Sequence, residues 1–168
     1  MSRFRSPSMS FAVLVAAGAV ASALALLLSI TLAARPASAK PASASAAAVT
    51  SIGLRKTGLG RLLVNSRGFT LYAFSRDGGG TDRCVQVRGC TGVWPVLRAT
   101  GRPVAGGGVE ASLLGTIGLP GGVRQVTYAG HPLYTYAFDN APAQTGYVGA
   151  SQFGGVWRAL TASGKLIG

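Results

Sequence analysis

The stretch FTLYAFSRD, residues 69–77, recurs 62 positions later as HPLYTYAFD, residues 131–139. When residues 60–77 are aligned with residues 122–139, six of eighteen positions are identical, whereas random matching gives roughly one. The identical pairs are Gly60 and Gly122, Val64 and Val126, Gly68 and Gly130, Leu71 and Leu133, Tyr72 and Tyr134, and Asp77 and Asp139. A further match, offset by 63 positions, pairs Gly92-Val93-Trp94 with Gly155-Val156-Trp157. The chain therefore contains two copies of one unit, over about residues 59–98 and 121–161.

Turn signals surround the repeated stretch in both copies. The apolar runs 62–65 and 69–74 flank Ser66-Arg67-Gly68, and the runs 123–128 and 132–136 flank Ala129-Gly130-His131. A glycine at such a place supplies the positive φ that a tight turn between strands requires. The sequence therefore predicts a β-hairpin at the start of each copy.

Residues outside these hairpins add short elements. Residues 114–119 predict another strand before the turn Pro120-Gly121-Gly122, and residues 94–98 and 109–114 predict single helical turns. No stretch after the predicted signal segment, residues 1–39, keeps a helical period for long. The predicted fold class is mainly β: two pseudo-symmetric repeats of short antiparallel strands, with long Gly-rich loops and a few single helical turns.

The aromatic residues of the repeat predict a shared core. Strand alternation places Tyr72 and Phe74 on one face, opposite Leu71 and Ala73. Tyr134 and Tyr136 repeat this pattern in the second copy, and Trp94 and Trp157 occupy matching places. We expect these rings to fill a core, and we expect Asp77 and Asp139 to cap the turns that follow. The alternative is an aromatic platform edged by carboxylates, which would suit a sugar or another planar ligand.

These motifs resemble a known bacterial family. The pattern Tyr, any residue, aromatic, two residues, Asp occurs at residues 72–77 and again at residues 134–139. Together with the Gly-Val-Trp matches, it resembles the bacterial secreted-repeat family of unknown function, described as predicted lipoproteins with a Yx(F/W/Y)xxD motif. The resemblance implies an exported, two-copy module without an established activity. The chain departs from the family description because no cysteine stands at the end of its apolar N-terminal run, where a lipoprotein would carry its lipid-modified cysteine.

The N-terminal residues predict export. Residues 1–10 carry Arg3 and Arg5 and no acid, and residues 11–34 contain no charge. This pattern predicts a signal peptide over residues 1–39, cleaved before Lys40, or alternatively an uncleaved anchor that contacts the membrane through residues 11–34. Both alternatives place the rest of the chain outside the cytoplasm.

The remainder divides into a linker and a domain. Residues 40–53 are rich in Ala, Ser and Pro and predict a flexible linker. Residues 54–168 form the predicted two-repeat β domain. From residue 40 onward the chain has 13 Lys and Arg against four acids. In an exported protein this excess favours an anionic envelope polymer, lipid head groups or an envelope protein as the partner, and no nucleic acid is expected.

The two cysteines predict a disulfide. Cys84 and Cys90 are close in sequence and are expected in an oxidising compartment, where such cysteines pair. Their spacing differs from the Cys-x-x-Cys of redox and haem motifs. A structural disulfide loop is therefore expected in the first copy.

Catalytic and metal-binding equipment is sparse. His131 is the single histidine, no Gly-x-Ser-x-Gly elbow occurs, and no phosphate-binding or dinucleotide fingerprint is found. We therefore predict no catalytic residues, no metal site and no cofactor. The leading interpretation is a non-catalytic binding or structural module of the cell envelope, for an anionic or carbohydrate-like surface or a protein partner. The alternatives are an accessory in extracytoplasmic electron or metal handling, and a wall-sugar hydrolase that uses Asp77 and Asp139.

Overall fold

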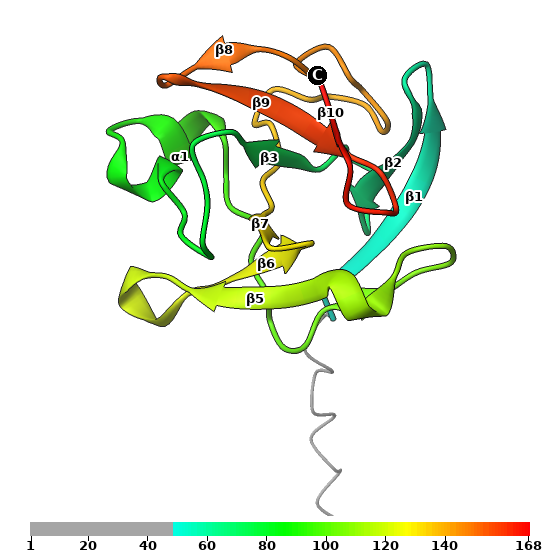
Figure 1. The fold of residues 1–168 in the computed structure, drawn as a ribbon, viewed down its shortest axis with the longest axis horizontal. Helices are drawn as coiled ribbons and strands as arrows, with labels where there is room; N and C mark the ends of the chain where they lie inside the picture. Colours follow the sequence, from blue (N-terminus) through cyan, green and yellow to red (C-terminus); the bar gives the residue numbers. More distant parts are fainter. Residues whose placement is uncertain (1–48) are drawn as a thin grey trace, which may run out of the picture. The chain divides into compact units, whose positions relative to one another are not determined.

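The computed structural model describes residues 49–168, so the predicted signal segment 1–39 and most of the predicted linker lie outside the described residues. Figure 1 shows how the fold of this part of the chain is arranged, and the fold has ten strands. They are β1 (Ser51–Thr57), β2 (Gly60–Asn65), β3 (Tyr72–Phe74), β4 (Val104–Ala105), β5 (Leu114–Gly118), β6 (Arg124–Tyr128), β7 (His131–Pro132), β8 (Ser151–Gln152), β9 (Gly155–Leu160) and β10 (Leu166–Ile167). The sequence analysis placed the start of the domain at residue 54. In the structure β1 begins at Ser51 and Ile52 is fully buried, so the folded part starts a few residues earlier.

Within the described residues, the helical elements are all single turns. They are the 3-10 turns η1 (Cys84–Gln86), η2 (Ala111–Leu113) and η3 (Pro120–Gly122) and the short helix α1 (Cys90–Val93). The turn expected within residues 109–114 is therefore present as η2. The helical turn expected at residues 94–98 is wrong, because that segment is extended and its backbone pairs with residues 125 and 134. Within residues 49–168, no helix is long and apolar enough to cross a membrane.

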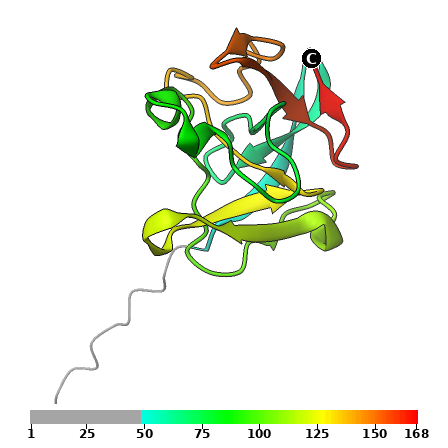
Figure 2. The ribbon, with the colours of Figure 1, turned by 60° about the vertical axis from the view of Figure 1, so that its left-hand side comes forward.

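The strands form three small sheets. Their orders are β2-β1-β4, β10-β9-β3 with β8 added beside β9, and β5-β6-β7. Figures 1 and 2 both show the β8–β9 ribbon and the β5–β6 ribbon on opposite sides of the domain, with β3 between them. All pairings are antiparallel except that of β1 with β4. The structure confirms the predicted mainly β class with two repeats.

Each copy opens with a hairpin and a tight turn. After β2, the Asn65 side chain accepts hydrogen bonds from the backbone N–H groups of Arg67 and Phe69, and Gly68 adopts a φ of 85°. After β6, Ala129 and Gly130 both have positive φ, which is the conformation of a two-residue hairpin turn. Both predicted turns are therefore confirmed, although the second strand of the later hairpin is only His131–Pro132.

The two copies pair with each other at their centre. The backbone N–H of Tyr72 donates to the carbonyl of Tyr134 at 2.9 Å, and the N–H of Tyr134 donates to the carbonyl of Tyr72 at 2.9 Å. This reciprocal pair joins identical positions of the repeat, so a pseudo-twofold axis passes between the two tyrosines.

The Gly-Val-Trp segments are exchanged between the copies. The N–H of Ser75 in the first copy donates to the carbonyl of Val156 in the second, at 2.9 Å. The equivalent bond runs from Ala137 in the second copy to Val93 in the first, also at 2.9 Å. Each copy therefore completes the sheet of the other, and a single copy leaves its central strand without a partner.

The paired central segments of the two copies, residues 71–74 and 133–136, separate two cores. Leu71, Ala73 and Leu133 belong to an aliphatic cluster with members from β1, β2, β6 and β9. Tyr72 and Phe74 point the other way, into an aromatic cluster. The members of this aromatic cluster are Tyr72, Phe74, Cys84, Cys90, Trp94, Tyr134, Tyr136 and Trp157. Because successive side chains of a strand point to opposite faces, alternate residues of the repeat enter the aliphatic core and the aromatic core.

Candidate functional site

The aromatic cluster is centred on the two tryptophans. The rings of Trp94 and Trp157 stack face to face, with centroids 3.9 Å apart and planes 4° apart. Tyr72 meets Trp94 edge-on at 5.1 Å, and Tyr134 meets Trp157 edge-on at the same distance. The pseudo-twofold axis thus relates the ring contacts as well as the backbone.

Every aromatic residue of the repeat motif lies in this core. Tyr72, Tyr134, Trp94 and Trp157 are 0 % exposed, and Tyr136 is 7 % exposed. Phe74 is also buried and stacks on Trp157 at 4.3 Å. A platform of displayed rings is therefore not formed by the motif residues.

The aspartates of the motif bind the tyrosines of the opposite copy. The Tyr134 hydroxyl donates to Asp77 Oδ2 at 2.7 Å, and the Tyr72 hydroxyl lies 3.4 Å from Asp139 Oδ2. Asp77 also accepts the backbone N–H of Arg83 at 2.7 Å through its other oxygen. The spacing of Tyr and Asp in the motif thus serves a reciprocal bond between copies, which a single copy cannot make.

Burial changes the acidity of these groups. Desolvation raises the pKa of Asp77 to about 6, although the Arg83 N–H and the Tyr134 hydroxyl oppose the shift. Desolvation also raises the pKa of Asp139 to about 6, and the Tyr72 hydroxyl opposes it. Burial and the nearby carboxylates raise the pKa of both Tyr72 and Tyr134 above the usual range.

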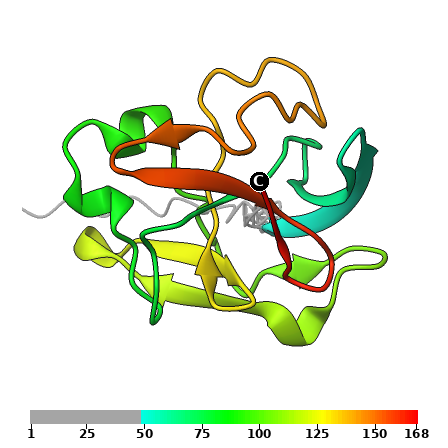
Figure 3. The ribbon, with the colours of Figure 1, turned by 45° about the horizontal axis from the view of Figure 1, so that its top comes forward.

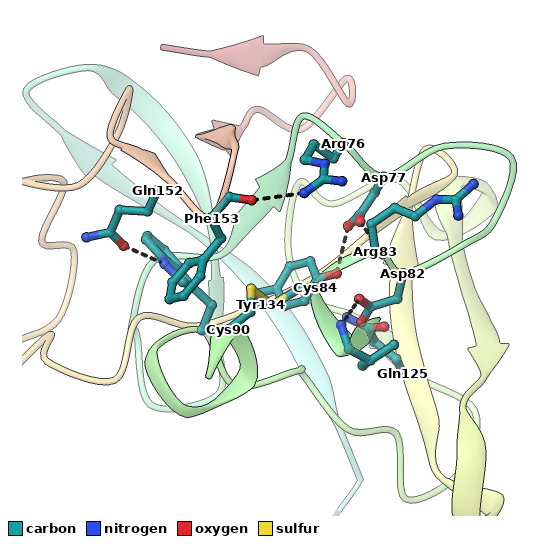
Figure 4. Close-up of a disulfide and its surroundings, with 12 residues drawn as sticks. Arg76, Asp77, Asp82, Arg83, Cys84, Cys90, Gln125, Tyr134, Gln152 and Phe153 are labelled. Atoms are coloured by element: carbon teal, nitrogen blue, oxygen red, sulfur yellow. Dashed lines mark hydrogen bonds between the residues drawn. A yellow bond between two sulfur atoms is a disulfide. The ribbon is translucent and has the colours of Figure 1, made fainter. Parts of the chain in front are cut away.

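The predicted disulfide is confirmed and forms part of the aromatic cluster. Cys84 and Cys90 are bonded, are fully buried and have Cα atoms 5.4 Å apart. Figure 4 shows the bridge beside Tyr134, whose hydroxyl is directed at Asp77. The sequence predicted a stapled loop, but it did not predict that the sulfurs pack against the motif rings.

Two residues of the second copy complete this cluster and were missed by the sequence reasoning. Tyr147 packs on Tyr136 with centroids 3.7 Å apart and meets Trp94 edge-on. Gln152 accepts a hydrogen bond from Trp94 Nε1 at 2.8 Å (Figure 4). Both lie where the copies differ, so the repeat alignment gave no signal for them.

The surface carries two adjoining basic depressions. One has a volume of about 470 Å³ and is lined by Arg102, Thr116 and Arg124, among others. The other, of about 400 Å³, is lined by Arg98 and again by Arg124. All three arginines are exposed. The side chains of Arg98 and Arg102 have no hydrogen-bond or ion-pair partner among residues 49–168, whereas Arg124 donates to the Thr116 hydroxyl. We call this the arginine face.

The acidic residues do little to neutralise the exposed cations. Residues 49–168 contain 12 Lys and Arg and four acids. Asp82 is 2 % exposed, and Asp77 and Asp139 are half-buried against tyrosine hydroxyls. Glu110 is the one acid of this part of the chain that is exposed. The outer charge of the domain is therefore strongly positive.

The structure brings together no metal-binding group in the part of the chain that it describes. No set of three His, Cys, Asp or Glu side chains gathers within residues 49–168. His131 lies at the start of β7, in the hairpin turn.

Comparison with known families identifies the repeat. Residues 53–98 and 115–161 each match the family described as a secreted repeat of unknown function. The chain belongs to that secreted-repeat family. The two matches begin within β1 and within β5, so each contains one copy of the repeat together with the strand that precedes it. No curated protein and no solved structure matches the chain.

Proposed function

We propose that this secreted-repeat domain is a non-catalytic module of the cell envelope that binds an anionic polymer through the arginine face. The observation that carries the proposal is the grouping of Arg98, Arg102 and Arg124 around two adjoining depressions. Planar guanidinium groups match phosphate and carboxylate geometry, and the two that have no protein partner within residues 49–168 keep their donors for a ligand.

The occupation of the motif aspartates supports the non-catalytic part of the proposal. A hydrolase would need Asp77 and Asp139 to face one substrate together, on either side of the bond that is cleaved. Instead, the tyrosine of the opposite copy occupies one oxygen of each carboxylate. The tyrosines and aspartates that the two copies share thus hold the copies together, and the proposed ligand contacts lie on the arginine face.

The phosphodiester chemistry of envelope polymers suits the arginine face. A chain of repeated phosphates presents an anion to each arginine in turn, and the summed positive field of the domain attracts it. A membrane offers the same phosphate as lipid head groups, but in a plane. The face is hollowed by two depressions, so we commit to a flexible polymer.

Binding of poly(glycerol phosphate) to the purified full-length protein tests the proposal. The double variant Arg102→Gln/Arg124→Gln should lose about 2 kcal/mol, because each cation near an anionic surface contributes about 1 kcal/mol. That is a weakening of roughly 30-fold.

A matched control removes two charges elsewhere. Arg88 and Lys165 are exposed and lie outside the arginine face. Arg88→Gln/Lys165→Gln should weaken binding only slightly in about 0.15 M salt, where charges further than about 8 Å away are screened. Equal weakening by both double variants, or equal binding of neutral dextran, would contradict the proposal. Binding to phosphatidylglycerol vesicles in place of the polymer would also contradict it.

A further inference from the structure

A third depression lies in the loop that follows Tyr136, outside the arginine face. Its volume is about 310 Å³, at the small end of the range for ligand pockets, which is about 300–1,000 Å³. The lining residues include Phe138, Asp139, Asn140, Gln144, Thr145 and Tyr147. Figure 3 shows this loop, in yellow and orange, on the side of the domain away from β5 and β6, as Figures 1 and 2 also do.

The depression presents an anchored aromatic ring to solvent. Phe138 is 66 % exposed, the largest value among the exposed large apolar side chains of residues 49–168. It meets Tyr136 at 5.4 Å, and Tyr147 packs on Tyr136 from 3.7 Å. Since Tyr136 is itself held against Trp94, the wall of the depression is fixed before any ligand arrives.

The repeat does not require this ring. The position equivalent to Phe138 in the first copy is Arg76, whose guanidinium donates to the Phe153 carbonyl at 3.0 Å. At this position of the repeat, a large apolar side chain is thus exposed in the second copy only. The core and the bonds between the copies are complete without it, so its exposure is not explained by folding.

The polar side of the depression is also fixed in place. Gln144 Oε1 accepts the backbone N–H groups of Asn140 and Ala141, and Gln144 Nε2 donates to Asn140 Oδ1 at 3.0 Å. The carbonyl of Gln144 accepts the hydroxyl of Thr70 at 2.5 Å, which ties the loop to the first copy.

These bonds leave polar atoms for a ligand. Asn140 Nδ2, Asp139 Oδ1 and the Thr145 hydroxyl have no partner among residues 49–168. They provide a donor, an acceptor and a group that can act as either, at the rim of an aromatic wall.

We propose that this depression binds a neutral sugar residue. The apolar face of a pyranose packs against an aromatic ring, and its hydroxyl groups both donate and accept, so they match a carboxylate beside an amide. The Asp139 carboxylate disfavours an anionic ligand, so this site is separate from the arginine face. A two-ring wall also leaves most of an ammonium ion uncovered, which favours the sugar over a cation.

Isothermal titration calorimetry of the purified full-length protein tests this inference, with cellotetraose and N-acetylchitotetraose as the two ligands. At least one of the two should bind saturably, and Phe138→Ala should weaken that binding at least tenfold. Because Phe138 is exposed, this variant should melt like the parent. Leu59→Ala, which removes another exposed apolar side chain, should bind like the parent.

Asn140→Asp separates a sugar from a cation. This substitution keeps the Oδ1 acceptor for Gln144, so the loop is retained, but it replaces the free donor with a second carboxylate oxygen. If the depression binds a sugar, this variant should bind the sugar more weakly and should not gain affinity for tetramethylammonium. If the depression instead binds a cation, the added carboxylate would strengthen binding of tetramethylammonium. The proposal is overturned by the absence of saturable binding of both tetrasaccharides, by binding that survives Phe138→Ala, or by tetramethylammonium binding that Asn140→Asp strengthens.

Discussion

Removal of the Tyr134 hydroxyl should destabilise the domain more than removal of the Tyr72 hydroxyl. The two hydroxyls occupy equivalent places in the repeat, but their geometry differs. Tyr134 lies 2.7 Å from Asp77, while Tyr72 lies 3.4 Å from both Asp139 and the Gln144 carbonyl. The shorter distance lies within the usual range for an O–H···O hydrogen bond, about 2.5–3.0 Å, and the two longer ones lie beyond it.

The expected magnitudes follow from these bonds. A hydrogen bond to a charged group contributes about 1.5–3 kcal/mol. In Tyr134→Phe, Asp77 keeps the Arg83 N–H, so we expect a loss of about 2 kcal/mol rather than the upper value. In Tyr72→Phe, the expected loss is about 0.5–1 kcal/mol. Each substitution removes a single oxygen atom, so neither leaves a large cavity that would add to the loss.

Urea denaturation, followed by the fluorescence of the two buried tryptophans, measures both losses. A domain of this size has a free energy of unfolding of about 5–15 kcal/mol, so both variants should stay folded. A double-mutant cycle of Tyr134→Phe with Asp77→Asn should give a coupling energy of about 1–2 kcal/mol. Equal losses in the two tyrosine variants, or a coupling energy near zero, would refute the reasoning.

Two further outcomes are expected. Asp77 and Asp139 each have a pKa of about 6 in the folded state, whereas the pKa of an unperturbed Asp is 3.8, so the folded state binds more protons between these two values. Their contribution to stability should therefore be full below about pH 4 and be lost as the pH rises through about 6, and Asp77→Asn/Asp139→Asn should remove this dependence in urea denaturation between about pH 4 and pH 7. A contribution that grows with pH would contradict the burial of the carboxylates. Cys84 and Cys90 should resist alkylation before reduction, and reduction should cost about 2 kcal/mol, the chain-entropy value for so short a loop; rapid labelling of two thiols in the native protein by mass spectrometry would disprove the bond.

The sequence predicted the local features because they depend on neighbouring residues. The glycine turns, the alternation of Leu71 and Tyr72, and the disulfide were all readable from spacing and residue type. The reciprocal pairing of the two copies could not be predicted from the sequence. Since both copies carry the same strand and the same Trp segment, pairing within a copy and pairing between copies satisfy the same chemistry, and no residue favours one over the other.

The wrong helical turn and the missed depression each have a physical cause. Residues 94–98 looked able to form a helical turn, but their backbone is committed to the strand of the opposite copy. The depression at Phe138 lies where the two copies differ, so a search for repeated residues passes over it. The comparison of Phe138 with Arg76 is the signal that was present: an apolar residue in one copy where the other has a charge.

The central claim is that the repeated aromatic residues build the core that joins the copies, and that ligands bind elsewhere. Thermal melting of Trp94→Ala and Trp157→Ala beside the parent tests it most directly. Both tryptophans are fully buried and stack on each other, so each substitution should cost about 3–5 kcal/mol and leave little folded protein. If both variants instead melt like the parent and lose binding of the anionic polymer, the tryptophans form the working surface and the claim is wrong.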